Sequence, residues 1–128
     1  MLSEMDSTTT FGRVSKLPAV SAVVCHHKGR LVVKAIQSIL KSRGVKVEII
    51  LMTSEKKLSL YGCKTIYVTG GPARKRNMAL RFCSNDLIAF FDDDVEVFPT
   101  CLQEMATYLT KNPTCGMVRL PRSIPSNE

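Results

Sequence analysis

Apolar residues along this chain form short runs that alternate with stretches of helical spacing. Short apolar runs bounded by polar residues or glycine predict buried strands. The candidate strands are residues 20–25, 45–52, 65–68, 87–91 and 116–120. Segments whose apolar residues recur on one helical face, or that open at a proline, predict helices. The candidate helices are residues 30–41, 73–83 and 99–112.

The order of these elements predicts an α/β fold. Strands that alternate with helices form a mostly parallel sheet, with right-handed crossovers that place helices on both faces. Ligands of such sheets bind beyond the carboxyl ends of the strands. Three polar segments follow candidate strands: His26-His27-Lys28, Thr53-Ser54-Glu55 and Asp92-Asp93-Asp94. We therefore expect a binding site at this edge of the sheet.

The chain length of 128 residues suits a single domain. We expect a flexible N-terminal tail at residues 1–18, a domain at 19–120 and a C-terminal tail at 121–128. The first residues lack the pattern of a secretory signal, and no apolar run approaches the ~20 residues of a membrane span. The five cysteines stand at irregular spacing without a CxxC pair, which favours reduced thiols. The expected location is the cytoplasm, either free or peripheral to a membrane.

The net charge of +7 is unevenly distributed along the chain. Residues 28–81 carry thirteen Lys or Arg against two Glu, whereas residues 82–104 carry six Asp or Glu and no Lys or Arg. A basic surround with one acidic focus suits a polyanion that is held partly through a metal ion, because the cation bridges carboxylates to phosphates.

The acidic focus is Asp92-Asp93-Asp94, directly after the apolar strand at 87–91. Carboxylates at positions i and i+2 leaving a strand project to the same side, so Asp92 and Asp94 can face one hard divalent cation. The sequence therefore predicts a Mg or Mn site at Asp92 and Asp94.

A basic focus follows the paired glycines Gly70-Gly71. Pro72 suits the first position of a helix, whose free N–H groups attract anions. Arg74, Lys75 and Arg76 stand in the first turns of this helix, where cations oppose the helix dipole. This placement favours a diphosphate-binding role.

These segments together resemble the family 2 glycosyltransferases of the GT-A fold. The order of the first strand, the helix near 31–40, the segment 71–80 and Phe90-Phe91-Asp92-Asp93-Asp94 carries the resemblance over about residues 19–120. It corresponds to the family's N-terminal, nucleotide-sugar-binding half. The resemblance implies a Rossmann-like GT-A nucleotide-diphospho-sugar transferase fold, in a truncated or minimal form.

The resemblance also implies a donor site. Asp94, with Asp92 or Asp93, would hold Mg or Mn against the diphosphate of a nucleotide-diphospho-sugar, while Arg76 and Asn77 would line the nucleotide pocket. The sugar would pass to an acceptor, a glycan, lipid or protein, with inversion at the anomeric carbon. The sequence does not choose among sugars, bases and acceptors.

Two segments depart from the family pattern. Cys25, His26 and His27 stand where the family usually has a Thr-Tyr-Asn turn, and Thr53 or Glu55 stands near its usual base-contacting aspartate. We count Cys25, His26, His27 and Thr53 as candidate substrate-binding residues. A metal pair of His26 and His27 is disfavoured, because neighbours on an extended chain point apart.

No general base is identifiable. After Asp94 the only carboxylates are Glu96, Glu104 and Glu128, none in an apolar setting that would raise its pKa. The chain ends before the family's acceptor-binding half, so we expect a second copy or a partner chain to supply the acceptor side.

Three other functions compete with a transferase. The first is a non-catalytic module that binds a nucleoside diphosphate. The second is a haloacid-dehalogenase-type phosphatase, whose aspartate motif belongs on the first strand of its domain rather than here. The third is a nucleic-acid surface on the basic segment, where few aromatics are available to stack bases, so no specific nucleic acid is expected.

Overall fold

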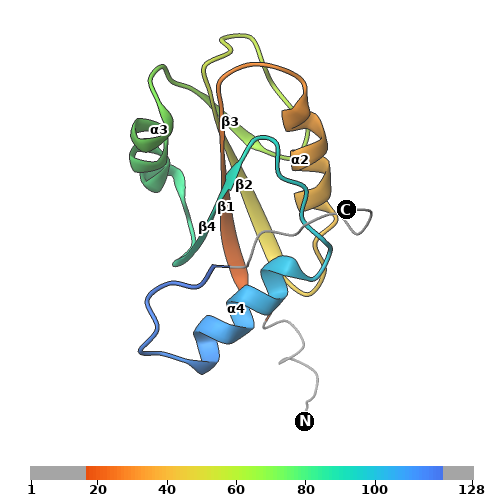
Figure 1. Cartoon of the computed structure of the whole chain (residues 1–128), viewed down its shortest axis with the longest axis vertical. Coiled ribbons are helices and arrows are strands. Elements are labelled where there is room, and N and C mark those ends of the chain that lie inside the picture. The colour runs from red at the N-terminus through yellow and green to blue at the C-terminus, as the bar shows by residue number, and fades with distance from the viewer. Residues whose placement is uncertain (1–16, 120–128) are drawn as a thin grey trace, which may run out of the picture.

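The computed structural model describes residues 17–119 and places a parallel four-stranded sheet at their centre. The strand order is β3-β2-β1-β4, and each strand pairs with its neighbours in parallel. The strands are β1 (Ala19–His26), β2 (Lys46–Thr53), β3 (Lys64–Tyr67) and β4 (Leu87–Asp92). The parallel α/β sheet is confirmed (Figure 1).

Helices cover both faces of this sheet (Figure 1). They are α2 (Leu31–Leu40), α3 (Pro72–Ala79) and α4 (Cys101–Lys111), and a short 3-10 turn, η2 (Leu80–Phe82), continues α3. Helices α2 and α4 pack on one face, whereas α3 packs on the other. The expectation of helices on both faces is confirmed.

Two apolar cores result from the alternation of side chains along the strands. Val20, Ala22 and Val24 of β1 pack with α2 and α4, whereas Val23 packs towards Ala79 of α3. Because both faces of β1 are covered, nearly all its residues are buried. This explains why the central strands read as continuous apolar runs.

Two expected elements differ from the structure. The α-helix expected to reach Cys83 ends at Ala79 and continues as the 3-10 turn η2, in which Phe82 still packs against the core and Leu80 is half-exposed. The strand expected at 116–120 is absent over residues 116–119, where Met117 is 80% exposed and no neighbouring strand pairs with it. Leu120 and most of both expected tails lie outside the described residues.

A polar network joins the strands near the amino end of the sheet. The Glu48 carboxylate of β2 accepts hydrogen bonds from the Ser21 hydroxyl (2.7 Å), the Ser84 N–H (2.7 Å) and the Ser84 hydroxyl (2.9 Å). Lys64 of β3 lies 3.6 Å from the same carboxylate, and Asn85 donates to Ser21. These hydrogen bonds, with the Lys64 charge, lower the pKa of Glu48 to about 2.

No helix among residues 17–119 is long and apolar enough to cross a membrane.

Candidate functional site

The residues singled out from the sequence converge at the carboxyl edge of the sheet. His26 ends β1, Thr53 ends β2 and Asp92 ends β4. In the strand register His26 is opposite Thr53, and Cys25 is opposite both Met52 and Asp92. Segments distant in the sequence are therefore brought together at the edge where ligands of parallel sheets bind.

The acidic triplet leaves β4 as a tight turn. Asp92 closes the strand, and its carbonyl accepts a long hydrogen bond from the Val95 N–H (3.4 Å). Asp92 and Asp94 are exposed, while Asp93 between them is half-buried. Asp93 and Asp94 belong to the turn and not to the strand, so the i and i+2 argument for a shared side stays a prediction.

The donor chemistry of this turn fits a hard divalent cation. Carboxylate oxygens are the ligands that Mg²⁺ and Mn²⁺ prefer, and two exposed carboxylates leave most of an octahedral shell to other oxygens. Within residues 17–119 no three His, Cys, Asp or Glu side chains gather into a metal cage. A cation bound at this turn would therefore need further oxygen ligands, from a bound molecule or from water, in addition to the protein carboxylates.

Helix α3 begins after the Gly70-Gly71 pair, and its Arg76 lies near this turn. Gly71 is its N-cap, with Pro72 in the first turn and no side-chain cap. Arg76 and Asn77 are exposed, and the Arg76 guanidinium lies 3.7 Å from Asp92 Oδ1. Because both side chains are exposed, this pair adds little stability and its charges remain available to a ligand.

Cys25 lies between the acidic turn and α3. Burial raises the pKa of its thiol, Asp92 and Asp93 raise it further, and Arg76 and Lys75 oppose the rise. The charges of both elements thus act on the same half-buried group. A raised pKa keeps the thiol protonated and unreactive near neutral pH.

His26 and Thr53 bind each other instead of facing solvent. Their exposed fractions are 1% and 0%, and His26 Nδ1 lies 2.8 Å from Thr53 Oγ1. His26 Nε2 lies 3.0 Å from the Gly29 carbonyl and 3.4 Å from Glu55 Oε1, and the Glu55 N–H donates to Thr53 Oγ1 (2.9 Å). The Gly29 carbonyl can only accept, so we assign the ring proton to Nε2 and the Thr53 hydroxyl as donor to Nδ1.

This network, the His26 clasp, ties the loop after β1 to the loop after β2. Its members are His26, Gly29, Thr53 and Glu55. By contrast His27, the next residue along the chain, is exposed.

Glu96 and Glu104 are the described carboxylates that follow Asp94 in the chain. Glu96 is exposed, and Glu104 accepts a hydrogen bond from Thr100 within the first turn of α4. Glu128 lies outside the described residues.

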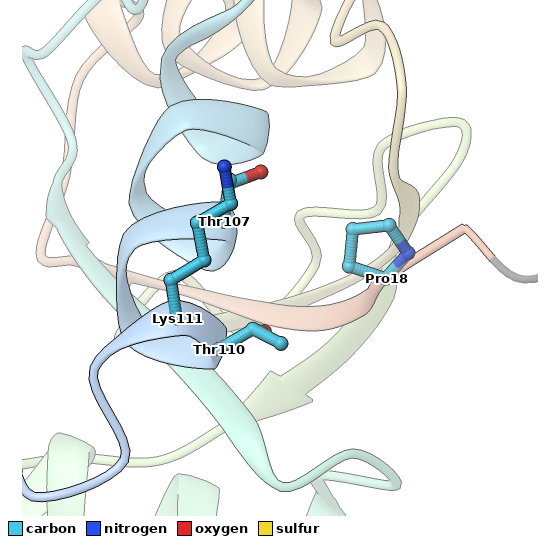
Figure 2. Close-up of a pocket in the computed structure, with 4 residues that line it drawn as sticks. All are labelled: Pro18, Thr107, Thr110 and Lys111. Carbon is cyan, nitrogen blue, oxygen red and sulfur yellow. The ribbon is translucent and has the colours of Figure 1, made fainter.

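A shallow pocket lies away from this edge, at the amino end of β1. It is lined by Pro18, Thr107, Thr110 and Lys111 (Figure 2). In Figure 2 the two threonines and Lys111 come from α4, with Pro18 across from them. None of the candidate site residues lines it, so it is separate from the candidate site.

Sequence reasoning missed two features of the site. It counted His26 and Thr53 as substrate-binding residues, although their polar side-chain atoms already form hydrogen bonds within the clasp. It also placed Lys75 with Arg74 and Arg76 without distinguishing their burial, although Lys75 is only 3% exposed. The four-residue spacing from Lys75 to the buried Ala79 was the available signal, because residues at i and i+4 share a helix face.

Comparison with known proteins decides the family. The family described as glycosyl transferase family 2 matches residues 21–127, most of the chain. The chain belongs to glycosyltransferase family 2. The earlier resemblance is therefore confirmed, and the α/β architecture described above is the GT-A fold.

Solved structures support the fold of this family 2 domain. A crystal structure of S. aureus TarS residues 1–349 superimposes with a TM-score of 0.65 at 15% sequence identity, covering 82% of this chain and 39% of that one. A second S. aureus TarS structure gives a TM-score of 0.62 at 18% identity, covering 84% and 23%. The chain therefore spans less than half the length of either structure. No curated protein sequence matches it.

Proposed function

We propose that this family 2 domain binds a nucleotide-diphospho-sugar at the carboxyl edge of its sheet and acts as a glycosyltransferase. The observation that carries the proposal is the juxtaposition of exposed Asp92 with Arg76, with exposed Asp94 in the turn that follows, at the edge where parallel sheets bind ligands. Cations and carboxylates that remain exposed side by side suit a diphosphate with its metal ion.

Asp92 and Asp94 would hold Mg or Mn, with Asp93 beside them. Such an ion supplies charge stabilisation to a departing nucleoside diphosphate. Arg76 places a bidentate donor next to the same turn, which suits phosphoryl oxygens, and exposed Asn77 adds an amide in the same helical turn. Transfer of the sugar would proceed with inversion.

The nucleotide end of the pocket would be formed by the loops after β1 and β2. Cys25 and His27 are accessible enough to contact a nucleotide directly. His26 and Thr53 would contribute by shaping the pocket, because the clasp already pairs their polar atoms. The exposed loops leave room for different bases.

The acceptor would be a glycan, lipid or protein, and a partner chain or a second copy would pack against the open edge of β4. Among the described residues no strand pairs with the outer edge of β4, and Phe90 on that strand is 45% exposed. An apolar side chain on an open sheet edge favours further association. The five cysteines are all free thiols, which supports a reducing compartment such as the cytoplasm.

A thermal-shift screen tests the donor site. The purified chain is heated with UDP, GDP, ADP, CDP or dTDP, each with Mn²⁺, Mg²⁺ or a chelator. We expect one nucleoside diphosphate to raise Tm with the metal and not with the chelator, since a ligand that binds only the folded state stabilises it. The same small response to every nucleotide, with or without metal, would contradict the proposal.

The second candidate is a non-catalytic module that binds the same nucleotide, favoured by the lack of an identifiable base among residues 17–119. Both candidates bind metal and nucleotide, and only the transferase releases nucleoside diphosphate from a sugar donor. Measuring that release with the donor chosen by the screen separates them.

A further inference from the structure

Helix α2 has one buried side and one outer side. The buried side consists of Val32, Ala35, Ile36 and Ile39. The exposed residues of the helix and its two caps are Arg30, Leu31, Val33, Lys34, Gln37, Leu40 and Lys41. We call these exposed residues, together with the neighbouring Tyr61, the outer face of α2. Figure 1 shows α2 at the side of the molecule, with this face turned away from the sheet.

Every charge on the outer face of α2 is positive. Residues 27–47, which contain the helix and the turns on either side, carry six Lys or Arg and no Asp or Glu. Lys34 and Lys41 are two helical turns apart, so both point to the same side. A helix that faces only water typically alternates charges of both signs along its exposed side. Cations without an acidic neighbour on the helix instead suit an anionic partner.

Apolar side chains lie beside these cations. Leu31 is 64% exposed and Leu40 is 44% exposed, and Val33 stands two helical turns before Leu40. The apolar strip continues onto the loop between β2 and β3. A Cβ added to Gly62 would lie 2.9 Å from Leu40 Cδ2, and the adjacent Tyr61 is 93% exposed. Single exposed apolar residues need no explanation, whereas a contiguous group marks an interaction surface.

A hollow of about 370 Å³ borders the outer face, between α2 and the loop that follows the acidic turn. Its lining includes Lys34, Gln37 and Lys41 from the outer face and Glu96 from the loop. Two ammonium groups therefore stand against one carboxylate, and the Gln37 amide adds further N–H donors. The hollow thus has the charge and the donors to receive the phosphate of a lipid headgroup.

We propose that the outer face of α2 docks on an anionic lipid membrane. Its cations bind lipid phosphates, while Leu40 and Tyr61 enter the interfacial layer, where tyrosine is enriched in membrane proteins. Affinity for nucleic acid rests on phosphate contacts and would leave the apolar strip unused. A folded protein partner is anchored in well-packed pockets, and the hollow beside this face is open and polar. This inference goes beyond the proposed function, because docking needs neither metal nor nucleotide.

Co-sedimentation with vesicles tests the docking at near-physiological salt. The vesicles contain phosphatidylcholine alone, or phosphatidylcholine mixed with phosphatidylglycerol. We expect the chain to bind the anionic vesicles only. The double variant Lys34→Gln with Lys41→Gln should weaken this binding by about tenfold or more, because two cations near the anionic surface are lost. The control is Arg81→Gln with Lys111→Gln, which removes the same charge from exposed positions in η2 and α4 and should change binding little.

A tryptophan substitution tests whether this face is the part that meets the lipid. The chain contains no Trp, so Tyr61→Trp carries a single one. We expect its emission to shift to shorter wavelength on anionic vesicles, and brominated lipids to quench it, because the ring leaves water for the interfacial layer. Tyr108→Trp is the control, since Tyr108 is half-exposed on α4, away from the outer face, and its emission should stay unchanged. Because Tyr61 is almost fully exposed, its substitution leaves the fold intact.

Equal binding of wild type to neutral and anionic vesicles, or binding to neither, overturns the inference. It is also overturned if the two double variants weaken binding alike, or if the emission of Tyr61→Trp stays unchanged on vesicles that carry the protein. Binding of polyglutamate or RNA through Lys34 and Lys41, without binding of vesicles, would assign the face to an acidic macromolecule instead. The nucleotide thermal shift is measured separately on the same variants and should match wild type, so failure of the docking leaves the proposed function standing.

Discussion

Charged side chains at the two ends of the sheet differ in whether the protein itself pairs them. At the amino end, Glu48 accepts three hydrogen bonds and faces Lys64, so its charge is neutralised within the protein. At the carboxyl end, Asp92 and Asp94 are exposed, and the Arg76 guanidinium lies 3.7 Å from Asp92.

This contrast separates charges that are paired within the fold from the exposed charges to which the proposed function gives a ligand. Hydrogen bonds lower the pKa of Glu48 to about 2, so the ionised carboxylate stabilises the folded state. The acidic turn has no such set of donors among the described residues. Charges that are paired within the protein stabilise the folded state. Under the proposed function, the exposed charges at the other end bind metal and diphosphate.

The largest expected effect is at the carboxyl end. Asp92→Asn with Asp94→Asn should abolish the metal-dependent binding of nucleoside diphosphate, because both proposed cation ligands lose their charge. The Tm without ligand should stay level or rise, since like charges are removed from one turn. Calorimetry with and without a chelator measures the first effect, and a melting curve measures the second.

Asp86→Asn is the matched control for this pair. Asp86 is exposed and precedes β4, at the opposite end of the same strand. Metal-dependent affinity that falls equally in this variant would show that net charge, rather than the acidic turn, governs binding.

A smaller effect, on stability alone, is expected at the amino end. Glu48→Gln should lower the free energy of unfolding by about 2 kcal/mol near neutral pH, because the neutral amide gives up charge-assisted hydrogen bonds. Since folding lowers the pKa of Glu48 from 4.5 to about 2, its contribution is complete above pH 4.5 and is lost as the pH falls towards 2. Urea denaturation between pH 2 and 7 should show this loss in wild type and little of it in the variant.

Glu96→Gln serves as the control, because Glu96 is exposed in the loop after the acidic turn. Nucleotide affinity should be the same in Glu48→Gln and wild type at neutral pH. If Glu48→Gln kept full stability but lost nucleotide binding, the amino end would have the binding role that we give to the carboxyl end.

The sequence was sufficient for features that depend on neighbouring residues. The abrupt change from Phe90-Phe91 to Asp92-Asp93-Asp94 located both a strand and its polar end, and the helix near 31–40 followed from its apolar spacing. The network of Glu48 could not be predicted, because Ser84 is 36 residues away in the chain. His26 and Thr53 are 27 residues apart, so their pairing needed the register of β1 and β2.

Local patterns also failed where burial decides the outcome. The apolar residues near 116–119 suggested a strand, but the described chain offers them no partner strand to bury against. Lys75 and Arg76 are neighbours with the same charge, yet one is buried and the other exposed. Which helix face meets the sheet is a property of packing, and charge patterning alone does not reveal it.

The variant Arg76→Ala tests whether the cation beside the acidic turn contributes to nucleotide binding. We expect binding of nucleoside diphosphate to weaken by about 2 kcal/mol, the range of hydrogen bonds to charged groups. Stability should change little, since the pair of Arg76 with Asp92 is exposed. Titration of this variant beside Arg81→Ala makes the measurement, and equal affinities in the two would remove Arg76 from the site.

The smallest effect is expected in the His26 clasp, at the carboxyl end of β1 and β2. Thr53→Val keeps the shape of the side chain and removes its hydroxyl, which leaves His26 Nδ1 and the Glu55 N–H without their partner. We expect a loss of about 1 kcal/mol in unfolding free energy and a similar weakening of nucleotide binding, because both loops beside the pocket are released. Ser54→Ala removes one hydrogen bond to Val68 from the same loop and is the control. If Thr53→Val loses stability and keeps its nucleotide affinity, the clasp, like the Glu48 network, stabilises the fold and has no role in nucleotide binding.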